Sequence, residues 1–259
     1  VYSIATGCNT RASGNFSTAM GSATTASNTA STAMGYATTA SGEVSTAMGS
    51  GTLASGEVST ATGSGTTASG YVSTAMGSGT TASGDYSTAL GTHASTNGKT
   101  GAFVIGDQST TTNLLAGANN ILTARFAGGY RLYTNAAMSL GVYISAGGTS
   151  WGSVSDSTKK CRYQMVDAEA MLSRFVALRL GSWNYTADPS PEQRHYGPMA
   201  QEWFAAFGHD GIGRIGNDTT LASADVDGVL CVAVQALEKR TAELNRKTAE
   251  LHQRTDEIA

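Results

Sequence analysis

Small polar and small apolar residues alternate along residues 1–98 in a pattern that repeats every 14 positions. The unit Ser-Thr-Ala-Met-Gly is complete at Ser17, and related five-residue units begin at Ser3, Ser31, Ser45, Ser59, Ser73 and Ser87. A second motif, Ala-Ser-Gly, recurs in phase at Ala12, Ala40, Ala54, Ala68 and Ala82. Because successive side chains of a strand point to opposite faces, Ser, Ala and Gly of each unit share one face, whereas Thr and Met share the other.

Each 14-residue unit predicts one turn of a β-solenoid, with two short strands and two corners at which glycine supplies conformational freedom. The Gly, Ser and Thr content excludes a helical repeat. The face of small residues suits the inside of a narrow roll. Such an interior buries mostly methyl groups, and at about 25 cal/mol per Å² it cannot offset an ordering entropy of roughly 1 to 2 kcal/mol per residue.

The opposite face carries larger apolar side chains that repeat with the same period. We expect this column to pack against sister chains, because obligate oligomerisation would supply the stability that a single roll lacks. Its members are Ile4 or Thr18, Met20, Met34, Met48, Met76 and Leu90.

The repeats over residues 1–98 resemble the head of trimeric autotransporter adhesins of the YadA type. The resemblance implies a left-handed parallel β-roll assembled as a homotrimer. It also implies adhesion to a surface ligand, either a cell-surface glycan or a protein receptor, rather than catalysis.

Larger side chains become frequent after Lys99, where residues 101–106, 122–126 and 130–134 predict short strands separated by glycine turns. The chain then changes to an α+β pattern. Asp167 is placed to cap a helix, residues 182–185 predict a strand, and residues 201–207 predict a second helix. A long helix is expected from Asp227 onward.

The last part of this helix has a heptad pattern. Aliphatic residues recur every seven positions, with threonines between them at alternating spacings of four and three, which is typical of a coiled-coil seam. Because each threonine hydroxyl must be satisfied in the seam, we expect the coil to depend on the domain beside it. The pattern comprises Leu237, Thr241, Leu244, Thr248, Leu251, Thr255 and Ile258.

An ordered set of motifs after residue 154 resembles the endosialidase-type intramolecular chaperone, the S74 family of self-cleaving peptidases. The segment from Phe126 through Asp156 likewise resembles the β-rich neck that precedes this domain in phage tail-fibre proteins. The motifs are Ser155-Asp156 with Lys160 five residues on, Trp183-Asn184-Tyr185, His195-Tyr196-Gly197-Pro198-Met199-Ala200-Gln201, and Asp225-Val226-Asp227-Gly228-Val229.

This resemblance implies that Ser155 attacks the carbonyl of Val154, so that the chain splits once, between Val154 and Ser155, after assembly. Asp156 belongs to the cleavage motif. A serine hydroxyl needs a base, and a lysine can serve if burial lowers its pKa, so Lys160 is the candidate base. Cys161-Arg162 departs from the acidic residue and asparagine that the family commonly has there, which bears on cleavage efficiency.

Two interpretations of this segment therefore remain open. In the first, Ser155, Asp156 and Lys160 carry out a single self-cleavage. In the second, Ser155-Asp156 makes only a turn or helix cap, and Lys160 is solvated. His195 could contact the serine, but a structural, hydrogen-bonded role is favoured.

The patterns divide the chain into YadA-like head repeats at 1–98, a β-rich neck at 99–152, an intramolecular chaperone domain at 153–236, and a coiled-coil helix at 237–259. The fold class is thus a mainly β N-terminal half followed by an α+β domain that ends in a long helix in a trimeric coiled coil.

Charge and composition narrow the possible partners. The formal net charge is -3 and Lys and Arg form no cluster, so nucleic acid is not expected as a ligand. No apolar run reaches the roughly 18 residues that a membrane span needs. The chain begins at Val1 without a signal peptide, so we expect a fragment or mature segment. The extracellular location that we expect, on a virion tail fibre or a bacterial cell surface, is implied by the two family resemblances.

Cysteine and histidine do not indicate a metal or cofactor. The three cysteines, Cys8, Cys161 and Cys231, are odd in number and far apart, so we expect reduced, partly buried thiols rather than disulfides or a zinc site. The other histidines, His93, His209 and His252, have no ligand spacing. No cofactor is expected.

The sequence favours a subunit of a phage tail-fibre tip or a bacterial surface adhesin. Alternatives are a structural filament without a receptor and a polysaccharide-degrading tailspike. The tailspike requires clustered carboxylates, and residues 1–150 contain only Glu43, Glu57, Asp85 and Asp107.

Overall fold

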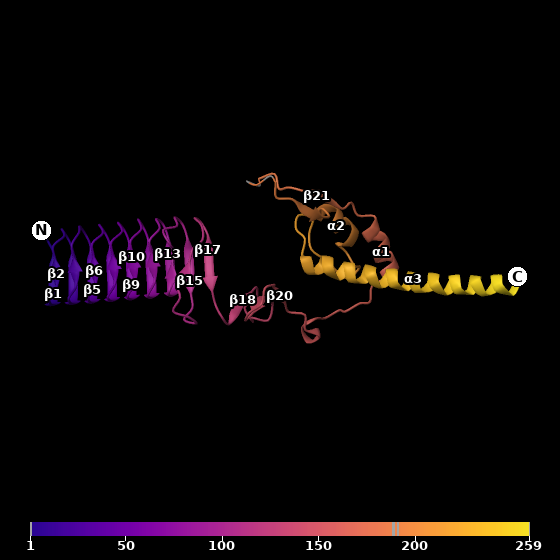
Figure 1. Cartoon of the computed structure of the whole chain (residues 1–259), viewed down its shortest axis with the longest axis horizontal. Helices are drawn as coiled ribbons and strands as arrows, with labels where there is room; N and C mark the ends of the chain where they lie inside the picture. Colours follow the sequence, from indigo (N-terminus) through magenta and orange to yellow (C-terminus); the bar gives the residue numbers. More distant parts are fainter. Residues whose placement is uncertain (1, 188–189, 191, 259) are drawn as a thin grey trace. The chain divides into compact units, whose positions relative to one another are not determined.

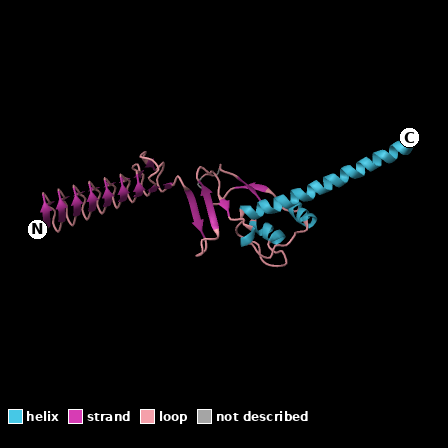
Figure 2. Ribbon diagram, turned by 90° about the horizontal axis from the view of Figure 1, so that it is seen from below, coloured by secondary structure: helices cyan, strands magenta, loops and turns pink. Residues whose placement is uncertain are grey.

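The structure is a computed structural model that describes residues 2–187, 190 and 192–258. The chain divides into two compact units, one ending at Asp156 and the other beginning at Ser157 (Figure 1). The first unit is built from strands, and the second contains the helices (Figure 2).

The first unit is a β-solenoid in which each turn contributes one strand of five residues and one of two, as the 14-residue period predicts. The longer strands are β1 (Ile4–Cys8), β3 (Thr18–Ser22), β5 (Thr32–Tyr36), β7 (Thr46–Ser50), β9 (Thr60–Ser64), β11 (Thr74–Ser78) and β13 (Thr88–Thr92). The shorter strands are β2 (Arg11–Ala12), β4 (Thr25–Ala26), β6 (Thr39–Ala40), β8 (Leu53–Ala54), β10 (Thr67–Ala68), β12 (Thr81–Ala82) and β14 (Ala94–Ser95).

Every strand of the solenoid pairs in parallel with the equivalent strand of the next turn. Within the repeats, the register joins residues 14 positions apart, so Ala33 pairs with Ala47 and Gly35 with Gly49. Over the described residues the longer strands form a nine-stranded sheet and the shorter strands an eight-stranded sheet. The predicted solenoid is therefore confirmed.

Alanine fills the space between these sheets, as the alternation predicts. From β3 to β14, the alanine of each long strand, such as Ala47, and that of each short strand, such as Ala54, is fully buried, whereas Ala5 and Ala12 of the first turn are not. Serine lies beside them, and in most turns its hydroxyl is satisfied within its own corner, as where Ser45 Oγ donates to the carbonyl oxygen of Gly42 at 2.6 Å. The hydroxyl of Ser73 and those of the buried threonines have no such partner, and these threonines are Thr24, Thr38, Thr52, Thr66 and Thr80. The interior is consequently made of side chains no larger than threonine until Val104.

The sheets extend beyond the end of the repeat at residue 98. Strands β15 (Phe103–Gly106) and β17 (Leu122–Arg125) continue the nine-stranded sheet, and β16 (Leu114–Leu115) continues the other. The register spacing grows from 14 to 15 between Ala89 and Val104, and larger loops separate later turns. Inward and outward alternation is thus kept after the repeated sequence is lost, and part of the segment predicted as neck belongs to the solenoid sheets.

An antiparallel sheet completes the first unit. It contains β18 (Gly129–Tyr133), β19 (Gly141–Ser145) and β20 (Gly152–Ser153). Phe126 and Tyr130 pack edge to face at its start, with ring centroids 5.6 Å apart.

An ion pair between Asp107 and Arg125 stabilises the final turn of the solenoid. Arg125 Nε donates to Oδ1 of Asp107 at 2.9 Å, and the backbone N–H of Ala127 donates to Oδ2 at 2.6 Å. The Ser109 hydroxyl donates to Oδ1 at 2.7 Å. The Ala127 amide, then Ser109, then the guanidinium hold the pKa of Asp107 well below its ordinary value, because each favours the ionised carboxylate.

An Asp107→Asn variant is expected to unfold at a lower temperature than wild type at pH 7. Because the folded-state pKa is depressed, the stabilisation is present above the pKa of an unfolded aspartate, about 4, and is lost as pH falls toward the folded-state value. When thermal unfolding of both proteins is measured between pH 7 and pH 2, the difference between their unfolding temperatures should therefore become smaller below about pH 4. If the difference in unfolding temperature between the two proteins does not change with pH, the charge of Asp107 does not contribute to stability.

The second unit contains the short 3-10 helix η1 (Ser157–Lys159), the hairpin of β21 (Gly181–Trp183) and β22 (His195–Gly197), and three α-helices among the described residues. These helices are α1 (Ala168–Val176), α2 (Ala200–Phe207) and α3 (Ser223–Ile258). The predicted cap is confirmed, since Asp167 Oδ1 accepts from the backbone N–H groups of Glu169 at 3.0 Å and Ala170 at 3.1 Å. Helix α3 begins four residues before the expected start at Asp227.

The first half of α3 packs on the other two helices. Val229 is buried with Trp203 and Phe207 of α2, while Ala233 and Ala236 are buried with Leu172 of α1. Alanines at these positions let α1 approach α3 closely.

The second half of α3 exposes its heptad seam. Leu237, Leu244 and Leu251 are each at least half exposed, which leaves a continuous apolar stripe on the described single chain. The seam threonines are satisfied within their own helix, since the hydroxyls of Thr241 and Thr248 each donate to the carbonyl oxygen four residues earlier at 2.9 Å. These hydroxyls therefore need no hydrogen-bond partner from another helix of the seam.

The cysteines differ from their expected burial. Cys8, Cys161 and Cys231 are free thiols, as expected, but all three are exposed rather than partly buried. Cys8 lies at the end of β1 and Cys231 lies on α3. Neither the repeat pattern nor the helix pattern places these two side chains in a core. None of the helices in the described residues combines the length and apolar character that a bilayer-spanning helix needs.

Candidate functional site

The predicted cleavage segment follows β20 directly and lies outside regular structure. Val154, Ser155 and Asp156 are exposed and form the end of the first unit. The peptide bond between Val154 and Ser155 is thus neither buried nor held in a strand or helix. An exposed, irregular segment of this kind can adopt the strained geometry that attack on its own backbone requires.

Lys160 lies at the start of the second unit, immediately after η1. Its backbone N–H donates to the carbonyl oxygen of Ser157 at 3.3 Å, which closes the turn, and its side chain is exposed. A lysine becomes a base when its surroundings disfavour the ammonium form, most simply by burial. The exposed side chain of Lys160 does not have that burial within the second unit.

His195 packs in a cluster of aromatic rings on the β21–β22 hairpin. Its ring stacks on Trp183 with centroids 4.8 Å apart, and Tyr185 meets both rings at steep angles. Arg194 fixes the opposite side of the hairpin by donating to Asn184 Oδ1 at 2.7 Å. These contacts give His195 a packing role within the hairpin.

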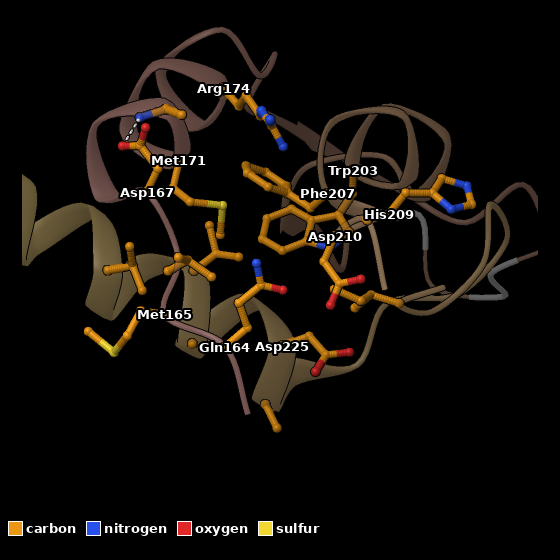
Figure 3. A pocket seen from close by; sticks show the side chains of 18 of the residues that line it. Gln164, Met165, Asp167, Met171, Arg174, Trp203, Phe207, His209, Asp210 and Asp225 are labelled. Atoms are coloured by element: carbon orange, nitrogen blue, oxygen red, sulfur yellow. Dashed lines mark hydrogen bonds between the residues drawn. The ribbon is translucent and has the colours of Figure 1, made fainter. Parts of the chain in front are cut away.

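The second unit also contains a cavity of about 630 Å³ that the sequence did not reveal (Figure 3). Met171, Trp203 and Phe207 line it with apolar surface from α1 and α2, and Asp210 and Asp225 add carboxylates. Its lining residues come from five separate segments, so no linear motif marks it. None of Ser155, Asp156 and Lys160 is among them.

Metal-binding chemistry has no support in the described part of the chain, where no group of three or more His, Cys, Asp or Glu side chains is placed to hold an ion. His209 instead packs against Phe204, with ring centroids 5.2 Å apart.

The solenoid presents its methionine column outward, as the alternation predicts. Met20, Met34 and Met76 are exposed on β3, β5 and β11, although an apolar side chain of this size gains about 1.5 to 3 kcal/mol from full burial. Together with the leucine seam of α3, the column leaves each unit with an apolar stripe that another chain could cover.

Comparison with protein families finds a match within each unit. The model of the YadA head domain repeat matches residues 1–24 and, in overlapping copies, 26–52, 40–66, 54–80 and 68–94. The model described as the chaperone of endosialidase, Peptidase_S74, matches residues 155–212. No curated protein matches the chain. The two resemblances inferred from the sequence are therefore confirmed, and the chain has the domain types of a fibre- or adhesin-type protein.

Proposed function

We propose that the chain is a subunit of an extracellular homotrimeric fibre, a phage tail-fibre tip or a bacterial adhesin, that binds a cell-surface glycan or protein. The observation that carries this proposal is the combination of a repetitive solenoid with a non-repetitive C-terminal domain in one chain. The exposed methionine column and the exposed leucine seam support assembly of several copies.

Register is the physical problem that such an assembly must solve. Successive turns pair residue for residue at a spacing of 14, and most turns have nearly the same outward side chains. Three solenoids could therefore slip past one another by a whole turn without exposing a different face. A terminal domain that fits together in only one way removes this ambiguity, which is the role we assign to residues 157–259.

We further propose that this domain releases itself by one self-cleavage. Ser155 Oγ attacks the carbonyl carbon of Val154, and its proton passes by way of Lys160 Nζ to the departing backbone nitrogen of Ser155. The peptide bond becomes an ester between Val154 and the Ser155 side chain. Water then hydrolyses this ester, leaving a carboxylate on Val154 and restoring the serine hydroxyl. Asp156 positions the segment.

Wild-type protein is expected to separate into two fragments with a new terminus at Ser155, whereas Ser155→Ala should stay whole. Lys160→Ala should slow the reaction by roughly 100-fold or more, the usual loss when a general base is removed. Ser157→Ala and Lys159→Ala change the same residue types within the segment and should cleave normally. Intact-mass analysis over a time course after expression gives the result.

Complete retention of full-length wild type in a correctly assembled trimer would contradict self-cleavage and leave the domain as a permanent clamp. The fibre proposal itself would survive that result, since it concerns assembly.

Receptor binding separates the proposed adhesin from a structural filament or a tailspike. The expected result is saturable binding of the trimer to a defined glycan or to host cells, without breakdown of the glycan. Absence of binding in a broad glycan and cell screen would favour the filament, and release of short saccharides would favour the tailspike.

A further inference from the structure

Each turn of the solenoid contains two corners, and each corner holds one residue in the left-handed backbone region. At the corner after the long strand, φ lies between +50° and +62°, and the residues are Asn9, Ala23, Ala37, Gly51, Gly65, Gly79 and His93. At the corner before the long strand, φ lies between +51° and +58°, and the residues are Phe16, Ala30, Val44, Val58, Val72 and Tyr86.

The two corners differ in the kind of residue that they place in this conformation. Glycine, alanine and asparagine predominate at the first corner. Glycine and asparagine adopt the left-handed region readily, and alanine is disfavoured there less strongly than a β-branched residue. The second corner has valine three times, although a β-branched side chain is strongly disfavoured there. Since the first corner turns the chain with small residues, turning alone does not account for the large side chains at the second.

Hydrogen bonds hold the unfavourable conformation in place. The backbone N–H of Val44 donates to the carbonyl oxygen of Thr29 at 2.9 Å, and that of Val58 donates to Glu43 at 2.8 Å. Each corner is thereby tied to the one before it, so the valine side chains project from the solenoid at a fixed angle.

The larger of these side chains form an apolar line, here called the corner ridge, which is interrupted by the small Ala30. Its members are Phe16, Val44, Val58, Val72 and Tyr86. All five are exposed, with the fraction ranging from 39% at Val72 to 65% at Phe16. Tyr71 extends the apolar surface at one point by packing edge to face on Tyr86, with centroids 5.3 Å apart. The ridge and the methionine column run along the same solenoid with the same period of 14 residues, because the strands of successive turns stack in register (Figure 1).

A closed ring of three identical chains requires each chain to offer two different surfaces, one to each neighbour. The ridge and the methionine column are two such surfaces. We propose that the corner ridge of one chain packs against the methionine column of a second copy of the chain, turn against equivalent turn. This inference rests on the proposed trimer and adds which surfaces meet and in what register.

Equal spacing of the two lines permits this contact wherever a turn contributes a large side chain to both of them. Two turns do not, because Thr62 takes the methionine position in the turn of Val58 and Ala30 takes the ridge position in the turn of Met34. Rotation about an axis along the solenoid leaves each turn at its own height, so Val44 of one chain meets Met48 of the next, and Val72 meets Met76. The residues flanking the methionines on β7 and β11 are Thr46, Ser50, Thr74 and Ser78, which add no charge to the contact.

Engineered disulfides test the contact in the full chain carrying Cys8→Ser, Cys161→Ser, Cys231→Ser and Ser155→Ala. In this background, Val44→Cys with Met48→Cys, and Val72→Cys with Met76→Cys, should give covalent trimers on a denaturing gel without reductant. A covalent trimer on the gel can only come from bonds between chains, because an intrachain disulfide leaves each chain at its monomer mass.

The matched control combines Val44→Cys with Met76→Cys, which lie two turns apart and should give no covalent trimer. Each single variant should likewise give none. If sedimentation shows a trimer but the in-register pairs do not link, and the cysteine at position 44 reacts freely with a thiol reagent, the ridge faces outward and this inference is wrong while the trimer stands. If sedimentation shows a monomer, the proposed function fails first.

A second test uses the sign of a stability change. Asparagine tolerates the left-handed region, so Val44→Asn with Val58→Asn and Val72→Asn relieves local strain. The proposed contact predicts that the midpoint of trimer unfolding nevertheless falls by several degrees. A midpoint that rises would mean that these valines make no contact, and it would overturn the inference even if the disulfide variants fail to fold.

Discussion

A Gly63→Ala variant is expected to lose the folded solenoid. Gly63 has φ +122°, and a Cβ atom there would lie 2.0 Å from the carbonyl oxygen of Gly77 in the next turn. That oxygen belongs to backbone held in register on both sides, so it cannot move away without breaking the sheet. Overlap with fixed backbone, together with a disfavoured φ, places the expected loss above about 4 kcal/mol, in the range reserved for disruption of a core.

The same close approach recurs at Gly21, Gly35, Gly49 and Gly77. The defect would therefore be equivalent wherever it is introduced. Circular dichroism and thermal unfolding of the purified chain measure the loss, and a poor yield of soluble protein is the expected accompaniment.

Gly65→Ala is the matched control two residues further on. Its φ is +60°, but no atom lies within 4 Å of the position that a Cβ would occupy. Ala23 and Ala37 already occupy the equivalent corner in other turns. The expected cost is below about 1 kcal/mol. Equal losses from Gly63→Ala and Gly65→Ala would contradict the argument that stacking between turns, rather than φ alone, demands glycine.

Placing charges in the α3 seam is expected to abolish assembly. Leu244→Asp with Leu251→Asp puts six carboxylates into the seam of a trimer, and each would have to be desolvated without a partner, at a cost of several kcal/mol per ion. The trimer should dissociate to single chains in sedimentation. The solenoid should then lose its common register and become prone to aggregation, since its apolar lines stay uncovered.

The control for the seam is Ala242→Asp with Ala249→Asp. These positions lie one residue after the threonines and face away from the seam, so the same two charges are added to the same helix. This variant should assemble like wild type. If both double variants stay trimeric, the seam is not an interface, and α3 is a solvent-exposed helix.

Much of the solenoid could be predicted because its determinants are local and repeated. Alternation within Ser-Thr-Ala-Met-Gly is enough to place Ala47 inside and Met48 outside, and the recurrence every 14 residues is enough to set the pairing. The capping role of Asp167 was predictable for the same reason, since it depends only on the next three residues.

Features that depend on contacts between distant residues could not be predicted in this way. Val104 keeps an inward position although its spacing from Ala89 is 15, so the end of the repeat did not mark the end of the sheet. The left-handed conformation of Val44 contradicts the preference of valine and follows from hydrogen bonds to the preceding turn. The cavity of the second unit joins residues from separate helices and loops, and no spacing indicated it.

The candidate cleavage site depends on the sequence motif and the family match. Ser155 and Lys160 are close in sequence, but the chemistry needs a buried lysine, and the side chain of Lys160 is exposed within the second unit. A motif can name the residues for such a reaction, whereas the environment that would activate them depends on contacts that the motif does not contain.

Sedimentation equilibrium of the full-length Ser155→Ala chain tests the central claim most directly, because this variant keeps both units together. The account predicts a single species with three times the 26.4 kDa mass of one chain, independent of protein concentration over the usual range. A monomer of 26.4 kDa that retains the β-rich circular dichroism spectrum of the solenoid would contradict it, since the roll would then be stable without its neighbours.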